Sequence, residues 1–261
     1  MALDAHMHLR PVDLESDCEG ALISYTQSVI EKMERAGVGG GILASNTMEH
    51  DQLDIVTRRF SGHFLGLLNM VPDMSQNLAD IEKYGDNPNI VGIKIYPNLW
   101  EDSKFSDDIQ PVLDEIEGRR WFIQVHSNPV VFEEVGLPLQ VRELAWKAEL
   151  PVVMVHCGGH QFMQVYGMLG HIPENLYFDT SAIQNIFCDS PARQQVRWLF
   201  ERLGERVFWA SDYPGYTFEA ALSAVEKYEF SSEKLIDLRY RNCVRFLEDW
   251  LGEGLLAFTQ S

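Results

Sequence analysis

Two histidines separated by one residue stand near the start of the chain, in the run Asp4-Ala5-His6-Met7-His8. Side chains alternate across a β-strand, so on a strand His6 and His8 point to the same face, with Cα atoms roughly 6 to 7 Å apart. That spacing suits two imidazoles that bind one metal ion, and it equally suits two hydrogen-bonded polar neighbours. The pair alone leaves both interpretations open, and the rest of the chain must decide between them.

Further residues of metal-ligand type end apolar runs later in the sequence. His126, His156 and Asp212 each end such a run, and Lys94 lies near the end of another. If the runs are parallel strands of a barrel, their carboxyl ends face one cavity, which is where barrel enzymes carry their functional groups. Histidines placed for packing or solubility would fall as often on helices, so the pattern favours a shared site.

The apolar runs recur at regular intervals, and each is followed by a segment with helical periodicity. The runs begin near Ala2, Gly39, Phe64, Ile90, Trp121, Pro151, Leu176 and Val207. The helical segments cover residues 24–36, 51–60, 75–84, 107–117, 139–148, 192–203 and 218–228, and a closing helix covers 232–250. Eight strand–helix units in 261 residues predict an α/β fold, a (β/α)8 TIM barrel, as a single domain over residues 1–261.

Two local sequence patterns concern the last helices of the chain. Ser231 offers a hydroxyl cap for the closing helix. Aromatic side chains occur at helical spacing in this part of the chain, at Trp198, Phe200, Phe246 and Trp250. Such spacing predicts contacts between these helices and the barrel.

The motifs, in their order along the chain, resemble those of the amidohydrolase superfamily, in particular its amidohydrolase-2 type of metal-dependent hydrolases and decarboxylases. The matching segments are Asp4-Ala5-His6-Met7-His8, Gly92-Ile93-Lys94-Ile95-Tyr96-Pro97, Val125-His126-Ser127, Val155-His156-Cys157-Gly158-Gly159, Tyr177-Phe178-Asp179-Thr180-Ser181, Ala210-Ser211-Asp212-Tyr213-Pro214 and Arg241-Asn242-Cys243. They run from the first strand to the last helix, so the resemblance covers essentially the whole chain. It implies a metal-dependent enzyme on a barrel fold.

In proteins of this type the first-strand histidines, the fifth-strand histidine and the eighth-strand aspartate hold a divalent metal. The resemblance places these roles on His6, His8, His126 and Asp212. It gives His156, at the sixth strand, either a second metal or the task of orienting and polarising the substrate. Three neutral imidazoles and a carboxylate suit Zn²⁺, or another divalent ion such as Mn²⁺, with a position left for water. We expect one ion, with two as the alternative.

The expected chemistry follows from the metal. Water bound to such an ion loses a proton near neutral pH. Asp212 can accept that proton and return it to a leaving group. His156 can hydrogen-bond the substrate carbonyl or the developing oxyanion. Asp212 and His156 are therefore the predicted catalytic residues.

Lys94 bears on the number of metal ions. Some members of the superfamily carboxylate the lysine on this strand and use it to bridge two metals, whereas others keep it as a free ammonium. A free Lys94 would bind a substrate carboxylate and would repel a second cation. The remaining alternative is a lysine at a strand end that reaches solvent.

Two further residues resemble substrate-binding elements of dihydroorotases. Arg10 completes a His-x-His-x-Arg element, and Asn46 stands in an Asn-Thr pair after the second strand. The resemblance implies that Arg10 and Asn46 hold a substrate carboxylate, and a surface ion pair is the alternative for Arg10. The segment 212–215 departs from the dihydroorotase pattern, which argues against dihydroorotase activity itself.

Composition narrows the class of partner. Thirty-nine acidic and 21 basic residues give a formal charge of −18, which disfavours binding to nucleic acid or to an anionic membrane. Four scattered cysteines, without a Cys-x-x-Cys pair, and the lack of a signal-like segment predict a cytoplasmic protein with reduced thiols. The expected partner is a small-molecule substrate, and a homo-oligomer stays open.

The sequence therefore predicts a metal-dependent hydrolase that cleaves a C–N or C–O bond with metal-activated water. The expected substrate is a small amide, cyclic amide or lactone, with a carboxylate as a further hypothesis. One alternative is a decarboxylase or lyase of the aminocarboxymuconate-semialdehyde decarboxylase type, which uses a similar metal site. The other alternative is a barrel that binds a metabolite without turnover.

Overall fold

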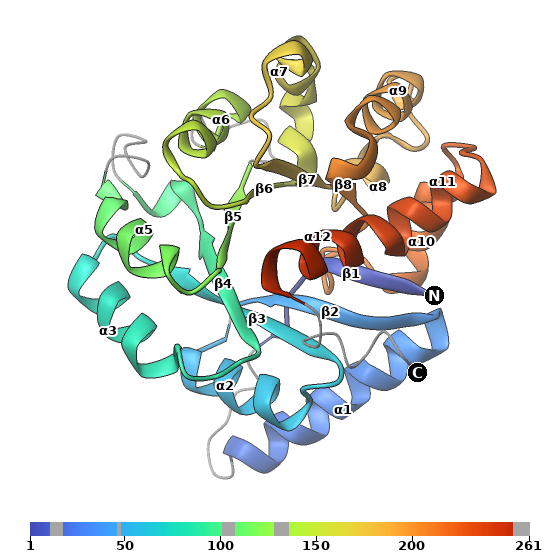
Figure 1. Ribbon diagram of the computed structural model, residues 1–261. Coiled ribbons are helices and arrows are strands. Elements are labelled where there is room, and N and C mark those ends of the chain that lie inside the picture. Colours follow the sequence, from blue (N-terminus) through green and yellow to red (C-terminus); the bar gives the residue numbers. More distant parts are fainter. Residues whose placement is uncertain (11–17, 46–47, 101–107, 128–135, 253–261) are drawn as a thin grey trace.

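The computed structural model describes residues 1–10, 18–45, 48–100, 108–127 and 136–252. Eight parallel strands form one sheet in the order β1 to β8, and helices surround it (Figure 1). The strands are β1 (Ala2–Met7), β2 (Val38–Ala44), β3 (Phe64–Met70), β4 (Ile90–Ile95), β5 (Phe122–His126), β6 (Val152–Val155), β7 (Leu176–Asp179) and β8 (Val207–Phe208). The predicted (β/α)8 TIM barrel is confirmed, and every strand begins within one residue of its predicted start.

Helices occupy the crossovers that parallel strands need. They are α1 (Cys18–Ala36), α2 (His50–Arg59), α3 (Met74–Tyr84), α5 (Gln110–Glu117), α6 (Pro138–Lys147), α7 (Phe162–Gly167), α8 (Ile183–Phe187), α9 (Arg193–Leu203), α10 (Phe218–Glu226), α11 (Ser232–Ile236) and α12 (Asn242–Leu251). Helix α1 begins earlier than the predicted residue 24. The reason is an additional apolar contact, because Leu22 is buried in the core.

The predicted closing helix over 232–250 is confirmed as one continuous helical segment, which contains a π turn that was not predicted. It consists of α11, a π-helical turn over Asp237–Arg241, and α12. The predicted cap is confirmed, because the Ser231 side chain accepts a hydrogen bond from Lys234 N at 3.2 Å. Within the π turn, the carbonyl of Leu238 accepts a hydrogen bond from Trp209 N at 2.8 Å. The π turn therefore ties this helical segment to the end of β8.

Backbone hydrogen bonds close the barrel between β1 and the segment that follows β8. Asp212 N donates to His6 O at 3.0 Å, and His8 N donates to Tyr213 O at 2.7 Å. These bonds fix two segments that carry predicted metal ligands directly against each other.

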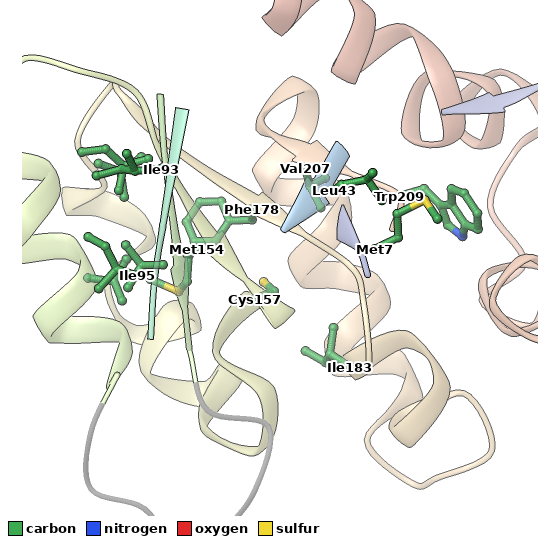
Figure 2. Close-up of a cluster of buried hydrophobic side chains, with 14 of the residues drawn as sticks. Met7, Leu43, Ile93, Ile95, Met154, Cys157, Phe178, Ile183, Val207 and Trp209 are labelled. Atoms are coloured by element: carbon green, nitrogen blue, oxygen red, sulfur yellow. The ribbon is translucent and has the colours of Figure 1, made fainter. Parts of the chain in front are cut away.

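Buried apolar side chains form two layers, one outside the barrel and one inside it. Figure 2 shows part of the outer layer, in which Met154 of β6, Phe178 of β7 and Ile183 of α8 belong to the same cluster. This layer packs the helices onto the strands. It contains many fully buried Val, Ile and Leu side chains, as expected of a parallel sheet that is covered by helices.

The inner layer is completed by α12, which covers the amino-terminal end of the barrel. The ring centroid of Phe246 lies 5.2 Å from that of Phe122, the first residue of β5, and 5.1 Å from that of Phe208 in β8. Because this end is filled by aromatic side chains, the polar residues of the strands are left to the opposite, carboxyl end.

The predicted core position of Trp198 is wrong. Its side chain is 38% exposed, and its ring packs on Tyr166 with the centroids 4.5 Å apart. The helical phase explains the difference, since the buried face of α9 consists of Val196, Leu199, Phe200 and Leu203. Phe200 and Phe246 are buried as predicted, and Trp250 is partly buried against the core.

Gly92 is required by the close approach of β4 to β5. A Cβ atom built at Gly92 would lie 2.1 Å from the carbonyl oxygen of Phe122. We expect Gly92→Ala to lower the free energy of unfolding by about 3 kcal/mol or more, because the backbone itself must shift. Urea denaturation followed by circular dichroism measures the change.

Gly118→Ala is the matched control for this prediction. Gly118 has an ordinary φ of −69°, and a Cβ there meets no atom within 4 Å. Equal stability of the two variants would contradict the packing argument.

Candidate metal centre

The structure places the predicted site residues at the carboxyl ends of their strands. His6 lies near the end of β1, Lys94 near the end of β4, and His126 is the last residue of β5. His156 directly follows β6, and Asp212 follows β8. This arrangement is the one expected from the sequence, and it comes from the common direction of the strands.

Asp212 lies close to two histidines, His6 in β1 and His8 directly after β1. Its Oδ1 atom lies 3.7 Å from His6 Nε2 and 3.6 Å from His8 Nε2. The His6 and His8 rings lie edge to face, with centroids 4.6 Å apart. These distances leave room for one cation between the imidazole nitrogens and the carboxylate.

The other two histidines lie on the same side of the barrel mouth. The ring centroid of His156 is 5.7 Å from that of His6 and 4.9 Å from that of His126. Ligand atoms of His6, His156 and Asp212 lie within 4.8 Å of one another. The structure thus gathers the predicted residues at the barrel mouth, but the described group close enough to share one ion includes His156, to which the resemblance gave a second role. The expected ligand His126 adjoins this group through its ring contact with His156.

A glutamine that the sequence analysis missed fixes the hydrogen on His6. Gln124 Nε2 donates to Ala5 O at 2.7 Å, so Gln124 Oε1 is oriented as an acceptor 2.9 Å from His6 Nδ1. His6 must then carry its hydrogen on Nδ1. Its Nε2 is buried and has no hydrogen-bond partner among the described residues. The lone pair of Nε2 therefore faces the Asp212 side of the site.

His8 is held in the same way by the backbone. Its Nδ1 lies 2.9 Å from the carbonyl oxygen of Ala44, at the end of β2. A carbonyl can only accept, so Nδ1 carries the hydrogen and Nε2 offers its lone pair toward Asp212. A hydrogen bond from the second nitrogen of a metal-binding histidine is the usual device that orients the ring.

Two of the site residues stand at unusual backbone conformations. His156 has a φ of 65°, Asp212 a φ of 60°, and Cys157, next to His156, a φ of 47°. Residues other than glycine rarely adopt positive φ, and such strain is concentrated at functional sites. The sharp turns after β6 and β8 aim the His156 and Asp212 side chains across the barrel mouth.

The electrostatics favour neutral imidazoles beside an ionised carboxylate. Burial, together with the charge of Lys94, lowers the pKa of His6 well below its usual value. Burial and the neighbouring His156 do the same to the pKa of His126. Burial opposes ionisation of Asp212, but His156 and His8 outweigh it and hold the pKa of this carboxyl below its usual value. Neutral imidazole and ionised carboxylate are the forms that bind a metal.

The residues present fit a divalent metal ion. The unpartnered, buried Nε2 of His6 is costly unless a ligand satisfies it. Imidazole nitrogens with one carboxylate form the donor set of Zn²⁺ and similar ions. We therefore treat this cluster as a candidate metal centre.

Lys94 lies beside the cluster and is fully buried. Its Nζ atom has no hydrogen-bond partner among the described residues and lies 5.0 Å from the ring centroid of Tyr96. Burial lowers the pKa of Lys94 to about 7, against the attraction of the Asp179 and Asp212 carboxylates. The interpretation of Lys94 as a lysine that reaches solvent is wrong. Carboxylated and free forms of the side chain both remain as predictions.

Of the two residues that resemble dihydroorotase elements, the structure describes Arg10 alone. Arg10 is exposed just beyond β1, and its backbone N donates to Tyr25 Oη at 3.4 Å. Asn46 lies outside the described residues. Carboxylate binding by Arg10 and Asn46 stays a prediction.

The barrel and the cluster at its carboxyl end define the class of barrel enzymes that carry a metal site at this position. The chain belongs to the amidohydrolase family. The Amidohydro_2 family model, described as Amidohydrolase, matches residues 4–248. This match confirms the resemblance drawn from the motifs, and no curated protein was found to match the sequence.

Solved structures with the same fold include enzymes of several reaction types. A probable 2-pyrone-4,6-dicarboxylic acid hydrolase from Acinetobacter baumannii, with citric acid bound, is 16% identical, with a TM-score of 0.67 over 96% of this chain and 99% of that chain. The 5-carboxyvanillate decarboxylase from Sphingomonas paucimobilis is 16% identical, with a TM-score of 0.64 over 94% and 97%. A 4-oxalomesaconate hydratase from Rhodopseudomonas palustris is 14% identical, with a TM-score of 0.65 over 94% and 95%. At these identities the likeness establishes the fold.

These comparisons fix the chain as a member of an enzyme family that acts on small molecules, and they leave the kind of reaction open. Among the described helices, none combines the length and the apolar character that spanning a bilayer requires.

Proposed function

We propose that the chain is a metal-dependent hydrolase that cleaves a C–N or C–O bond of a small, carboxylate-bearing molecule. The observation that supports this most is the convergence of His6 Nε2 and His8 Nε2 on one oxygen of Asp212, with the hydrogens of both rings committed elsewhere. His126 and His156 complete the set of residues that would hold the ion. When bound, the metal supplies a Lewis acid that acidifies water and polarises a carbonyl.

The protein's own groups would then move protons at the reacting centre. Asp212 is held ionised, so it can accept a proton from water and pass it to the departing nitrogen or oxygen. His156 offers Nε2 as an acceptor, because its Nδ1 lies 2.8 Å from Ser181 Oγ and 3.2 Å from Ser181 O. A neutral His156 is therefore suited to accept a proton or to bind the ion, and it could donate to an oxyanion only after it has been protonated.

Lys94 and Tyr96 are the groups that would bind a substrate carboxylate. Lys94 Nζ and Tyr96 Oη are both buried without a hydrogen-bond partner among the described residues. Leaving such donors unpaired costs free energy, and an anionic ligand would satisfy them. An anionic substrate is also consistent with the dicarboxylic acid and carboxyvanillate named for two of the solved structures of the same fold.

We expect Lys94→Met to raise KM for carboxylate substrates by about 10- to 100-fold, because it removes a charged hydrogen-bond donor. The same change is expected to raise the melting temperature, since methionine fills the site without an unpaired amine. Steady-state kinetics and calorimetry measure the two effects. Lys83→Met, at an exposed lysine of α3, is the control, and an unchanged KM in Lys94→Met would contradict the assignment.

We expect one divalent ion per chain in the purified protein, because the described cluster contains one carboxylate and a free Lys94 beside it would repel a second cation when protonated. Elemental analysis after dialysis measures the ratio, and a His6→Asn variant should bring it close to zero. Two ions per chain would instead favour a carboxylated Lys94 that bridges them.

Decarboxylation is the second candidate reaction. Decarboxylases stand beside a hydrolase among the solved structures with this fold, and the same Lys94 could bind the carboxylate that leaves. A panel of lactones, amides and aromatic acids separates the two reactions. Release of CO2 from an acid, without hydrolysis of any lactone or amide, would replace the hydrolase proposal.

A further inference from the structure

His156 stands at the head of a short line of buried hydrogen-bonding groups. Its Nδ1 atom lies 2.8 Å from Ser181 Oγ, and the Ser181 hydroxyl in turn contacts Asp179 Oδ1. Ser181 and Asp179 are fully buried at the end of β7, the strand that pairs with β6 ahead of His156. The three side chains thus form a line that leads away from the metal cluster.

The direction of each hydrogen bond follows from the carboxylate. Asp179 Oδ1 accepts from the backbone N of His156 at 2.9 Å and from the backbone N of Ser181 at 3.0 Å. Because this oxygen acts as an acceptor, the Ser181 hydroxyl donates to it. Ser181 Oγ is then free to accept from His156. The carbonyl of Ser181, 3.2 Å from Nδ1, can only accept, so both contacts require the hydrogen on His156 Nδ1.

The same carboxylate also anchors the backbone of His156. His156 N donates to Asp179 Oδ1, and His156 itself has a φ of 65°, a left-handed conformation that residues other than glycine rarely adopt. One buried side chain therefore holds both the strained backbone and, through Ser181, the ring. A residue fixed at two points has little freedom to rotate its Nε2 away from the site.

We infer that Ser181 and Asp179 are positioning residues, which hold His156 as the Nδ1–H tautomer and present its Nε2 lone pair to the cluster around Asp212. They do for His156 what Gln124 does for His6 and the carbonyl of Ala44 does for His8. The assignment of the tautomer rests on these contacts alone. The consequence for turnover rests on the proposed function.

The tautomer is tested by two-bond ¹H–¹⁵N correlation spectra of protein labelled with ¹⁵N-histidine, recorded with and without added zinc. A His156→Asn spectrum assigns the resonances. We expect native His156 to carry its hydrogen on Nδ1 in both samples. In Ser181→Ala, which keeps the longer contact to the carbonyl, the ratio of Nε2–H to Nδ1–H should rise between about twofold and tenfold.

The kinetic expectation is a fall in kcat of about 10- to 100-fold in Ser181→Ala, with little change in KM, since substrate contacts stay in place. Ser127→Ala is the matched control. Ser127 is an equally buried serine that contacts Val155 O and accepts from Gly158 N at 2.9 Å, so it holds the same turn without touching the imidazole. It should lose stability without any change of the His156 tautomer.

Two results would overturn the inference. One is a native His156 with its hydrogen on Nε2. The other is a Ser181→Ala spectrum with the native tautomer ratio. Both results are read from the spectra, so they do not depend on whether a hydrolysed substrate is found. A failure of the proposed function is seen separately, as a lack of turnover in the native protein.

Discussion

Asp212→Asn is expected to lower kcat by about 10²- to 10⁴-fold while the protein stays folded. Asp212 is the one carboxylate within 3.7 Å of the Nε2 atoms of both His6 and His8 in the described part of the chain. Replacing it by an amide removes the group that would accept and return the proton, and a general acid–base group of this kind contributes about that factor. The amide also weakens the metal site, which lowers the activity further.

Asparagine is the informative replacement because of the backbone. Asp212 has a φ of 60°, a conformation that asparagine tolerates and alanine does not favour. The backbone bonds from Asp212 N to His6 O and from Gly215 N to Asp212 O do not involve the carboxylate. Loss of activity with an unchanged melting temperature would therefore report on chemistry.

Measurement of kcat and of bound metal on the same preparation separates the two contributions. Asp189→Asn, at an exposed carboxylate that pairs with Lys227, serves as the control and should keep full activity. A metal-loaded Asp212→Asn enzyme with native kcat would remove Asp212 from the proton transfer.

Gln124→Leu is expected to weaken metal binding by about 10- to 100-fold. Gln124 is buried in β5, and its amide joins Ala5 O to His6 Nδ1. Leucine has a similar volume but leaves His6 free to place its hydrogen on Nε2, the atom that should face the metal. Loss of such an outer hydrogen bond to a metal-binding histidine typically has an effect of this size. Competition with a chromophoric chelator measures the dissociation constant for zinc.

Gln184→Leu is the matched control for this change. Gln184 is also fully buried, and its amide donates to Ala210 O at 2.7 Å and accepts from Thr180, so its loss also breaks a bond to a backbone carbonyl without touching a histidine. Both variants should lose stability, and only Gln124→Leu should lose metal affinity. Equal affinities in the two variants would mean that His6 keeps its orientation without Gln124.

The sequence was sufficient to place the strands and the inward-facing histidines. Continuous runs of Val, Ile and Leu mark parallel strands because both faces of such strands are buried, and the histidines at their ends were visible as polar interruptions. The closing helix was predicted with the right extent, but not the π turn inside it, since nothing in its periodicity distinguishes a π turn from a regular one. Trp198 was misplaced because it neighbours the buried Leu199 and Phe200 on a short amphipathic helix.

The hydrogen-bonding partners behind the histidines were harder to foresee. Gln124 lies 118 residues from His6, and Ser181 lies 25 residues from His156. The first pair joins β1 to β5 across the barrel, and the second joins residues that follow the neighbouring strands β6 and β7. Neither pair leaves a local pattern in the sequence. One signal was present, however: Gln124 is a polar residue inside an apolar strand, two positions before His126 and therefore on the same face.

Asn242 gained a physical role only from the structure. Its side chain donates to Gly204 O at 3.1 Å and to Val207 O at 2.9 Å. These bonds tie the start of α12 to the start of β8. The residue matched a family motif in the sequence, and its task is to join the final helix to the last strand.

The π turn over Asp237–Arg241 has a consequence for how the chain tolerates change. An α-helix advances about 100° per residue, so adding or deleting a single amino acid here would swing everything downstream around the helix axis. Phe246 would then leave the aromatic floor that it shares with Phe122 and Phe208. A change in the length of this stretch would therefore remove the helix that closes the amino-terminal end of the barrel, even though every residue of that helix stayed the same.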